Sequence, residues 1–361
     1  MSYTKRPIVY LGFNDPRLHA RGTENVIRAQ AVATEGRHYY VFRSSKFKVF
    51  RWEGIVAIGC PVNLLLAGLF LRRLVSRIRR RKAVTPLLHG HSFLLSAVAS
   101  GAPQVFTVHD GLTYLKRHNG AKHLWLYALV ERFVYWRAVK IHAISRYAWS
   151  EACGSSASTE KLTIISNSIS TAVAKNSAVD ISSIPRGSPE YLIVRSIEER
   201  ANLNLVLELA KHCLKHEPDA LILVAGKGPL LSHYREAVIA QGLTNLRFLG
   251  YVSDAVLDAL YRRASCVIMT AIYGEGFGLP LIEAYARGIP AVGSDVCAVP
   301  EVIAAPSLLF SNDLPALIAA IKVASRMPRE SFIDHFHRNF NRDSTIGEYR
   351  DFYRSVPCTP V

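Results

Sequence analysis

Two carboxylates, Glu275 and Glu283, flank the segment Gly276-Phe277-Gly278-Leu279-Pro280. An apolar run ends at residue 270, just before this segment, and Pro280 suits the first turn of a helix. The pattern predicts a strand, a Gly-rich loop and a helix. Such a turn leaves backbone N–H groups and the positive end of the helix facing the ligand side of a sheet, where they favour a phosphate.

Two acids beside an anion site suggest a ligand that carries hydroxyl groups as well as phosphates. Glu283 would bond the hydroxyls of a ribose and Glu275 those of a sugar, with the amides of Phe277, Gly278 and Leu279 holding the group between them. A nucleotide sugar has this layout. The alternative is a helix capped by a Gly-rich turn, with Glu283 a solvated acid favoured by the helix dipole. The spacing of the acids and glycines favours the binding site.

These residues resemble the signature of the family-4 retaining glycosyltransferases of the GT-B fold: a Glu, seven residues and a second Glu. The resemblance is clear from about Ile193 to Phe310 and weaker in the first half. It implies an α/β fold of two Rossmann-like, doubly wound parallel-sheet domains that face each other across a cleft. It also implies a hexosyltransferase that uses a nucleotide sugar, retains the anomeric configuration and needs no bound metal ion or other cofactor.

The resemblance assigns roles to further residues. Arg195, at the end of an expected strand, matches the Arg that pairs with the donor phosphates, where it would stabilise the leaving diphosphate. The Lys that usually follows is replaced by Ala201, so either Arg200 supplies the second cation or the site is weaker. Gly226 matches a turn near the nucleotide base. The Thr270-Ala271 pair stands where Pro-Ser is common, and we expect no effect of this difference on the chemistry.

Histidines end two expected strands in the first half, at the edge of the sheet where ligands bind. His109 also matches the family's His that helps align the donor sugar, and His91 is a second candidate. Gly22 matches a glycine that faces the donor diphosphate, although Arg21 replaces a second Gly and a plain helix N-terminus is the alternative. We therefore expect His109, Arg195 and Glu275 to be catalytic, and the donor to be bound by Gly22, Arg200, Gly226, Phe277, Gly278, Leu279 and Glu283.

The elements that must position these residues are short apolar runs alternating with helical segments, which is typical of parallel, doubly wound sheets. A polar stretch rich in Ser, Ala and Pro divides the chain. We expect an acceptor-binding domain over residues 1–170, a linker over 171–189 and a nucleotide-sugar-binding domain over 190–342. Residues 343–361 would form a C-terminal helix, and the resemblance implies that it can cross back to the first domain. The chain has 361 residues, half of them hydrophobic, which is enough for two cores.

The formal charge of +16 calls for an acidic partner. Nucleic acid is disfavoured because we find no zinc-knuckle spacing and no RRM-like aromatic strand. The segment Arg72–Lys82 carries cations on one helical face and apolar residues on the other, which favours contact with an anionic membrane surface. Because the apolar face should cover the sheet, we expect electrostatic contact without insertion. A solvated charged helix is the alternative.

Other features concern the acceptor and the location. A basic loop at residues 114–118 and an aromatic helix at 124–136 would guide a glycan or a polyprenyl or other lipid-linked acceptor. The uncharged stretch Ile55–Leu71 is broken by Gly59 and Pro61, so we expect no membrane span. Scattered cysteines without a Cys-x-x-Cys pair, and no signal peptide, predict a cytoplasmic protein with reduced thiols, placed peripherally at the inner face of a membrane. The cysteines are Cys60, Cys153, Cys213, Cys266, Cys297 and Cys358.

Two other functions stay open. One is a sugar-nucleotide epimerase of the same fold. The other is a catalytically inactive nucleotide-binding scaffold of a membrane glycan-assembly complex, motivated by the missing Lys and the altered pair of glycines. The donor base, UDP or GDP, the donor sugar and the linkage also stay open.

Overall fold

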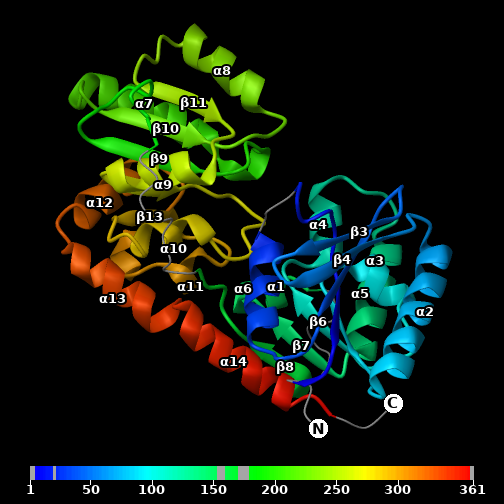
Figure 1. Ribbon diagram of the computed structural model, residues 1–361. Helices are drawn as coiled ribbons and strands as arrows, with labels where there is room; N and C mark the ends of the chain where they lie inside the picture. Colours follow the sequence, from blue (N-terminus) through cyan, green and yellow to red (C-terminus); the bar gives the residue numbers. More distant parts are fainter. Residues whose placement is uncertain (1–4, 19–21, 153–158, 170–178, 358–361) are drawn as a thin grey trace. The chain divides into compact units, whose positions relative to one another are not determined.

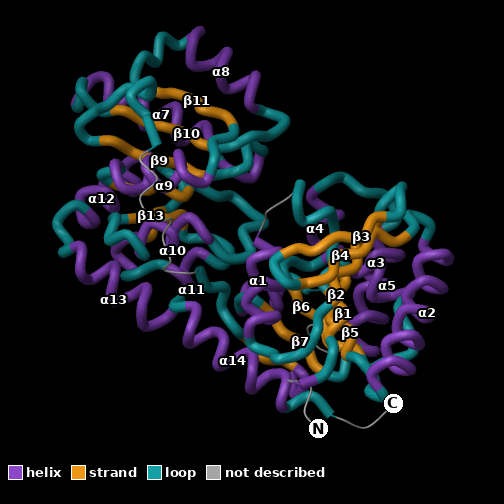
Figure 2. The backbone as a smooth tube through the Cα atoms, viewed as in Figure 1, coloured by secondary structure: helices purple, strands orange, loops and turns teal. Residues whose placement is uncertain are grey.

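The computed structural model describes residues 5–18, 22–152, 159–169 and 179–357 (Figure 1). The chain divides into two compact units. The first unit contains Met1–Ser168 and Arg342–Val361, and the second contains Ile169–Asn341. Each unit is built around one sheet with helices beside it, as the colouring by secondary structure in Figure 2 shows.

The sheet of the first unit has eight strands among the described residues, in the order β3-β4-β2-β1-β5-β6-β7-β8. The strands are β1 (Ile8–Leu11), β2 (Tyr39–Arg43), β3 (Lys48–Trp52), β4 (Ile55–Cys60), β5 (Leu87–Gly90), β6 (Gln104–Val108), β7 (Lys140–Ala143) and β8 (Leu162–Ile164). All neighbours pair in parallel except β3, which is antiparallel to β4. The central strands are buried on both faces, which explains their continuous apolar runs.

Helices cover both faces of this sheet. On one face lie α2 (Leu64–Lys82), α3 (Phe93–Val98) and α5 (Leu124–Arg137), and their cores include Leu88 and Phe106. Side chains alternate along a strand, so the neighbouring residues His89 and Thr107 point to the other face. There they meet α1 (Gly22–Val32) and α14 (Arg342–Arg354), which pack together. Two short helices, α4 (Leu112–His118) and α6 (Arg146–Ser150), follow β6 and β7.

The sheet of the second unit has six parallel strands in the described part of the chain, in the order β11-β10-β9-β12-β13-β14. They are β9 (Glu190–Val194), β10 (Leu221–Ala225), β11 (Leu246–Gly250), β12 (Cys266–Met269), β13 (Ala291–Ser294) and β14 (Leu309–Phe310). The α-helices are α7 (Leu203–His216), α8 (Leu231–Ala240), α9 (Asp254–Arg263), α10 (Leu279–Tyr285), α11 (Val299–Val302), α12 (Leu314–Ala324) and α13 (Arg329–Asn339). Short connections alternate strand and helix, so the predicted doubly wound architecture is confirmed for both units.

The structure differs from the prediction at two local features. β3 was not expected; it forms a hairpin with β4 through Glu53 and Gly54, which both have positive φ, as tight hairpin turns require. The segment 114–118 lies in the helix α4 and is not a loop, because the side chain of Glu131 on α5 accepts hydrogen bonds from the backbone N–H and hydroxyl of Thr113. These bonds secure the first turn of α4.

None of the described helices is both long and apolar enough to cross a membrane. Four described cysteines are free: Cys60, Cys213 and Cys266 are buried and Cys297 is half-buried. Burial raises the pKa of the Cys60 thiol to about 11. Cys153 and Cys358 lie outside the described residues.

Candidate functional site

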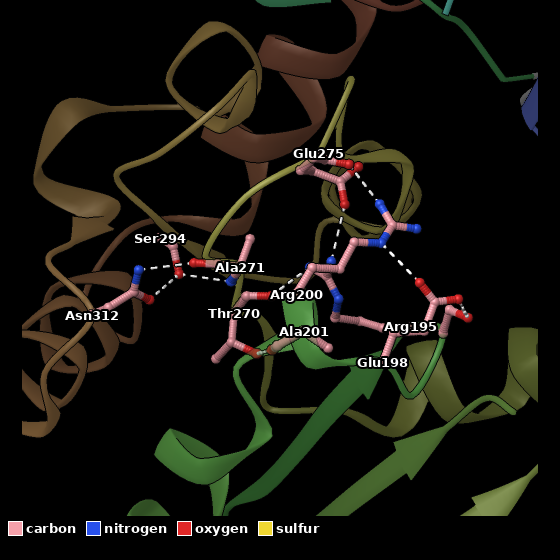
Figure 3. Close-up of polar contacts among 11 residues, drawn as sticks. Arg195, Glu198, Arg200, Ala201, Thr270, Ala271, Glu275, Ser294 and Asn312 are labelled. Atoms are coloured by element: carbon pink, nitrogen blue, oxygen red, sulfur yellow. Dashed lines mark hydrogen bonds and ion pairs between the residues drawn. The ribbon is translucent and has the colours of Figure 1, made fainter. Parts of the chain in front are cut away.

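The carboxyl ends of two adjacent strands form the centre of the candidate site in the second unit. β12 pairs with β9 in a register that puts Val267 opposite Leu192. Three residues further along, Thr270 therefore comes to lie beside Arg195. The loop that leaves β12 carries Glu275, and Figure 3 shows its carboxylate directed at the Arg195 guanidinium.

The Arg195 guanidinium is held by groups from the neighbouring strand and loop. Its side chain is only 6% exposed, one terminal nitrogen donates to the carbonyl of Thr270, and the other lies 3.2 Å from a Glu275 carboxylate oxygen. Burial lowers the pKa of the guanidinium, and the negative charge of Glu275 opposes that shift. Each terminal nitrogen carries a second N–H, so the group can still donate to an anion.

Gly226 shapes the backbone at Arg195. Its φ of 151° lies in a region that favours glycine, and a Cβ atom there would sit 1.7 Å from the carbonyl oxygen of Arg195. The Arg195 N–H donates to Ala225 and the Gly226 N–H donates to Gly250. Gly226 thus permits the close approach of β10 to the end of β9.

Arg200 brings a second cation to the same loop. It lies in the short 3₁₀ helix Glu199–Ala201, pairs with Glu198 at 3.1 Å and donates to the carbonyl of Gly274 in the Gly-rich loop. Its positive charge adds to the effect of burial, which lowers the pKa of Arg195. Ala201, at the position of the expected Lys, is fully buried.

The Gly-rich loop turns sharply into α10. Gly274 and Gly278 have φ values of 68° and 106°, and Gly278 precedes the first turn, which contains Pro280. The Phe277 ring is buried and packs edge-on against Phe340, with ring centroids 5.9 Å apart, so its side chain belongs to the core. The amides of Phe277, Gly278 and Leu279 donate to no other described residue.

Glu283 is half-buried on α10 and lies apart from the Arg195–Glu275 pair in its contacts. Its carboxylate accepts a hydrogen bond of 2.6 Å from the buried Tyr261 hydroxyl. Burial raises the pKa of Glu283, while this bond and the nearby Arg287 lower it. The Glu283 carboxylate is therefore held in one orientation by Tyr261 and is not a freely solvated side chain.

Several residues that the sequence did not point to hold the loop. Asn312 accepts from Ser294 and donates to the carbonyl of Ala271, each at 2.8 Å, and the Ala271 N–H donates to Ser294 at 3.0 Å (Figure 3). Thr270 also takes part: its hydroxyl donates to the carbonyl of Ala201, besides its own carbonyl holding Arg195. Thr270, which stands where Pro is common in the resembled family, therefore contacts residues of the candidate site. A lone Asn far along the chain gives no sequence signal.

The first unit contains the two remaining candidates. His109 follows β6, is half-buried, and its Nε2 lies 2.9 Å from Nδ1 of His91. Gly22 is the first residue of α1 and is half-buried. Arg21 lies outside the described residues. In the part of the chain that the structure describes, no three His, Cys, Asp or Glu side chains are grouped as metal ligands.

The two doubly wound units define a GT-B fold, and solved structures share it. Sucrose-phosphate synthase from Thermosynechococcus elongatus superimposes with a TM-score of 0.76 at 18% sequence identity, covering 98% of this chain and 99% of that one. Anabaena HepE, solved in complex with UDP-glucose, gives a TM-score of 0.75 at 15% identity, covering 96% of this chain and 98% of its own.

The second unit also matches a sequence family. Residues 175–330 match the family model described as glycosyl transferases group 1. The O-antigen chain mannosyltransferase B of Escherichia coli is 43% identical over 77 residues, 21% of this chain and 20% of that protein. The phosphatidyl-myo-inositol mannosyltransferase of Mycobacterium leprae is 29% identical over 296 residues, 76% of this chain and 74% of that protein.

Proposed function

We propose that the protein is a retaining glycosyltransferase that moves a hexosyl group from a nucleoside diphosphate sugar to a hydroxyl of a glycan or lipid-linked acceptor. The observation that carries the proposal is the grouping of Arg195, Arg200 and Glu275 at the ends of β9 and β12, within the segment that matches glycosyl transferases group 1. The alternatives are an epimerase and an inactive scaffold.

The chemistry follows from where charge develops. Negative charge builds on the diphosphate as the bond to the sugar breaks, and preorganised cations lower the energy of that state. Arg195 is already oriented by Thr270 and Glu275, so little reorganisation is needed. Arg200 supplies the second cation in place of the absent Lys, and the amides of Phe277 to Leu279 supply neutral donors. Glu275 would orient the sugar, and Glu283 would bond the ribose.

Similar proteins support the choice of substrates. HepE was solved with UDP-glucose, and two of the relatives named above are mannosyltransferases, one of them acting on phosphatidyl-myo-inositol and the other on an O-antigen chain. For this chain we propose a nucleotide-sugar donor and an acceptor that is lipid-linked or part of a surface polysaccharide. Independence from a bound metal ion remains part of the proposal.

The exposed side chains of α2 and α5 in the first unit support binding of the protein to an anionic membrane surface. The expected apolar face of α2 does cover the sheet, whereas its seven cations are exposed. On the same side of the sheet, α5 leaves Trp125 and Trp136 exposed by 60% and 73%, together with Leu129 and Phe133. α3 packs against both helices and joins them into one layer. Because apolar side chains accompany the cations, we propose shallow insertion in addition to electrostatic contact.

The proposal is tested by release of nucleoside diphosphate from a panel of UDP- and GDP-sugars with lipid-linked and glycan acceptors. Arg195→Lys should lower kcat by about 10²- to 10³-fold, since a bidentate donor aimed at the developing charge is lost. Arg263→Lys is the matched control, because Arg263 forms a comparable buried pair with Glu190, at 2.7 Å, elsewhere in the unit. It should keep the wild-type kcat.

Other outcomes separate the alternatives. Binding of a nucleotide sugar, seen as a raised melting temperature, without turnover on any acceptor would favour the scaffold. A changed sugar with no acceptor consumed would favour the epimerase. Equal loss of activity in Arg195→Lys and Arg263→Lys would show that the Arg195 effect is structural and would remove the main support for the proposed site.

A further inference from the structure

A chain of buried polar groups runs through the first unit from β8 to His109. It contains four histidines, none of which forms a hydrogen bond with a carboxylate among the described residues, together with the side chains of Thr107 and Gln30. His89, His91, His142, Gln30 and Thr107 are each at most 1% exposed. In a neutral histidine one ring nitrogen carries a proton and donates, and the other accepts. One known donor in the chain can therefore determine the direction of every other hydrogen bond in it.

The chain of hydrogen bonds begins at a backbone carbonyl, which can act only as an acceptor. The carbonyl of Ile165, just after β8, can only accept, so Nε2 of His142, at 2.9 Å, carries a proton and donates. Burial lowers the pKa of His142 to about 4, so this ring is neutral near pH 7 and its Nδ1 can only accept. The Thr107 hydroxyl, 3.1 Å away, must then donate its single proton to that Nδ1.

The Thr107 hydroxyl determines the direction of its hydrogen bonds with His89 and Gln30. Its proton is used, so its oxygen accepts from Nε2 of His89 at 2.7 Å and from the amide nitrogen of Gln30 at 3.2 Å. His89 then has a bare Nδ1, which accepts from the hydroxyl of Tyr353 on α14 at 2.7 Å. Gln30 is fixed in one orientation, with its amide oxygen directed at His91.

The last two hydrogen bonds of the chain reach His109. Because the Gln30 oxygen only accepts, Nε2 of His91, at 3.1 Å, donates to it. Burial lowers the pKa of His91 well below its usual value, so the ring is neutral and its Nδ1 accepts from Nε2 of His109 at 2.9 Å. Loss of hydration around its ring, with a smaller contribution from His142, lowers the pKa of His109 to about 3, so this ring too is neutral near pH 7. Its Nδ1 receives no hydrogen bond from any described residue.

We infer that this chain of hydrogen bonds holds His109 as the Nε2–H tautomer, so that its Nδ1 can accept a hydrogen bond from a donor group of a ligand. His91, Gln30 and Thr107 are positioning residues: they do not touch the substrate but determine which His109 nitrogen carries the proton and how the ring lies. The tautomer does not depend on the function proposed above.

The tautomer is tested on the free full-length protein labelled with ¹⁵N-histidine. NMR should show a through-bond coupling across the N–H···N bond, with the proton on Nε2 of His109 and the bare nitrogen on His91. Assignment uses His109→Gln and His91→Phe. A proton attached to His91 Nδ1, or a bare Nε2 on His109, would overturn the inference whether or not the protein turns over a nucleotide sugar.

Discussion

Acidification should destabilise the first unit selectively, because its core buries neutral histidines. A histidine has a pKa of about 6.5 in an unfolded chain. His89, His91 and His142 are 0–1% exposed, and burial lowers the pKa of each in the folded protein. The unfolded state therefore binds more protons below pH 6.5. The stability that these neutral rings provide is complete above that pH and is lost as the pH falls toward their folded-state pKa values.

The size of the effect follows from the unfolded-state pKa. Between pH 7.5 and 5.5, each fully buried neutral histidine costs about 1.4 kcal/mol of unfolding free energy, so the three together cost about 4 kcal/mol. Buried His38, whose pKa burial lowers to about 4, adds to the loss. Asp15, with a pKa lowered to about 2, matters only in stronger acid, and the raised pKa of Glu348 acts in the opposite direction.

The assay uses the distribution of tryptophan. All four tryptophans, Trp52, Trp125, Trp136 and Trp149, lie in the first unit, so fluorescence reports its unfolding in urea. The slope of stability against pH measures proton uptake, which we expect to be about three protons or more at pH 5.5.

A variant identifies the source of these protons. His142→Gln should reduce the uptake by about one proton, whereas His118→Gln, at an exposed position of the same unit, should not change it. Stability that is flat from pH 7.5 to 5.5, or an uptake unaffected by His142→Gln, would refute the account of the buried histidines.

Three further predictions concern the second unit, the membrane face and metal. Gly226→Ala should lower the unfolding free energy by more than about 2 kcal/mol because its Cβ would meet the Arg195 carbonyl, whereas Gly242→Ala, with positive φ but open space, should cost about 1 kcal/mol. Replacing Arg77, Arg80 and Arg81 by Gln should weaken binding to anionic vesicles roughly 100-fold at low salt, at about 1 kcal/mol for each cation, and unchanged sedimentation would contradict the proposed surface. Turnover should survive dialysis against EDTA; its loss, restored by a divalent cation, would contradict the proposed independence from metal.

The fold was accessible from the sequence because it depends on patterns along the chain. Apolar runs alternating with helical segments predicted two parallel sheets, and Pro280 and the glycines located the turn into α10. β3 was missed because an edge strand of a hairpin is only partly buried and lacks a continuous apolar run. The short turn at Glu53 and Gly54 was its only other signal.

The candidate site was accessible only in part. A resemblance pointed to Arg195 and Glu275, and the structure brings them together through strand register. Their contacts with the Thr270 carbonyl and the support from Asn312 arise from residues far apart in the sequence. The histidine chain shows the same limit: each histidine is visible, but the direction of its hydrogen bonds depends on Gln30, which no local pattern connects to them.

The first unit is discontinuous in the sequence, since Arg342–Val361 joins Met1–Ser168 with the whole second unit between them. Domains generally fold as they leave the ribosome, the N-terminal one first. Here the order should be reversed, because Ile169–Asn341 emerges whole before α14 is available to bring the Tyr353 hydroxyl to His89. Until residues 342–354 have been synthesised, the half-finished first unit would lack the helix whose side chains Tyr349, Phe352 and Tyr353 are buried in it, so aromatic surface would stay exposed.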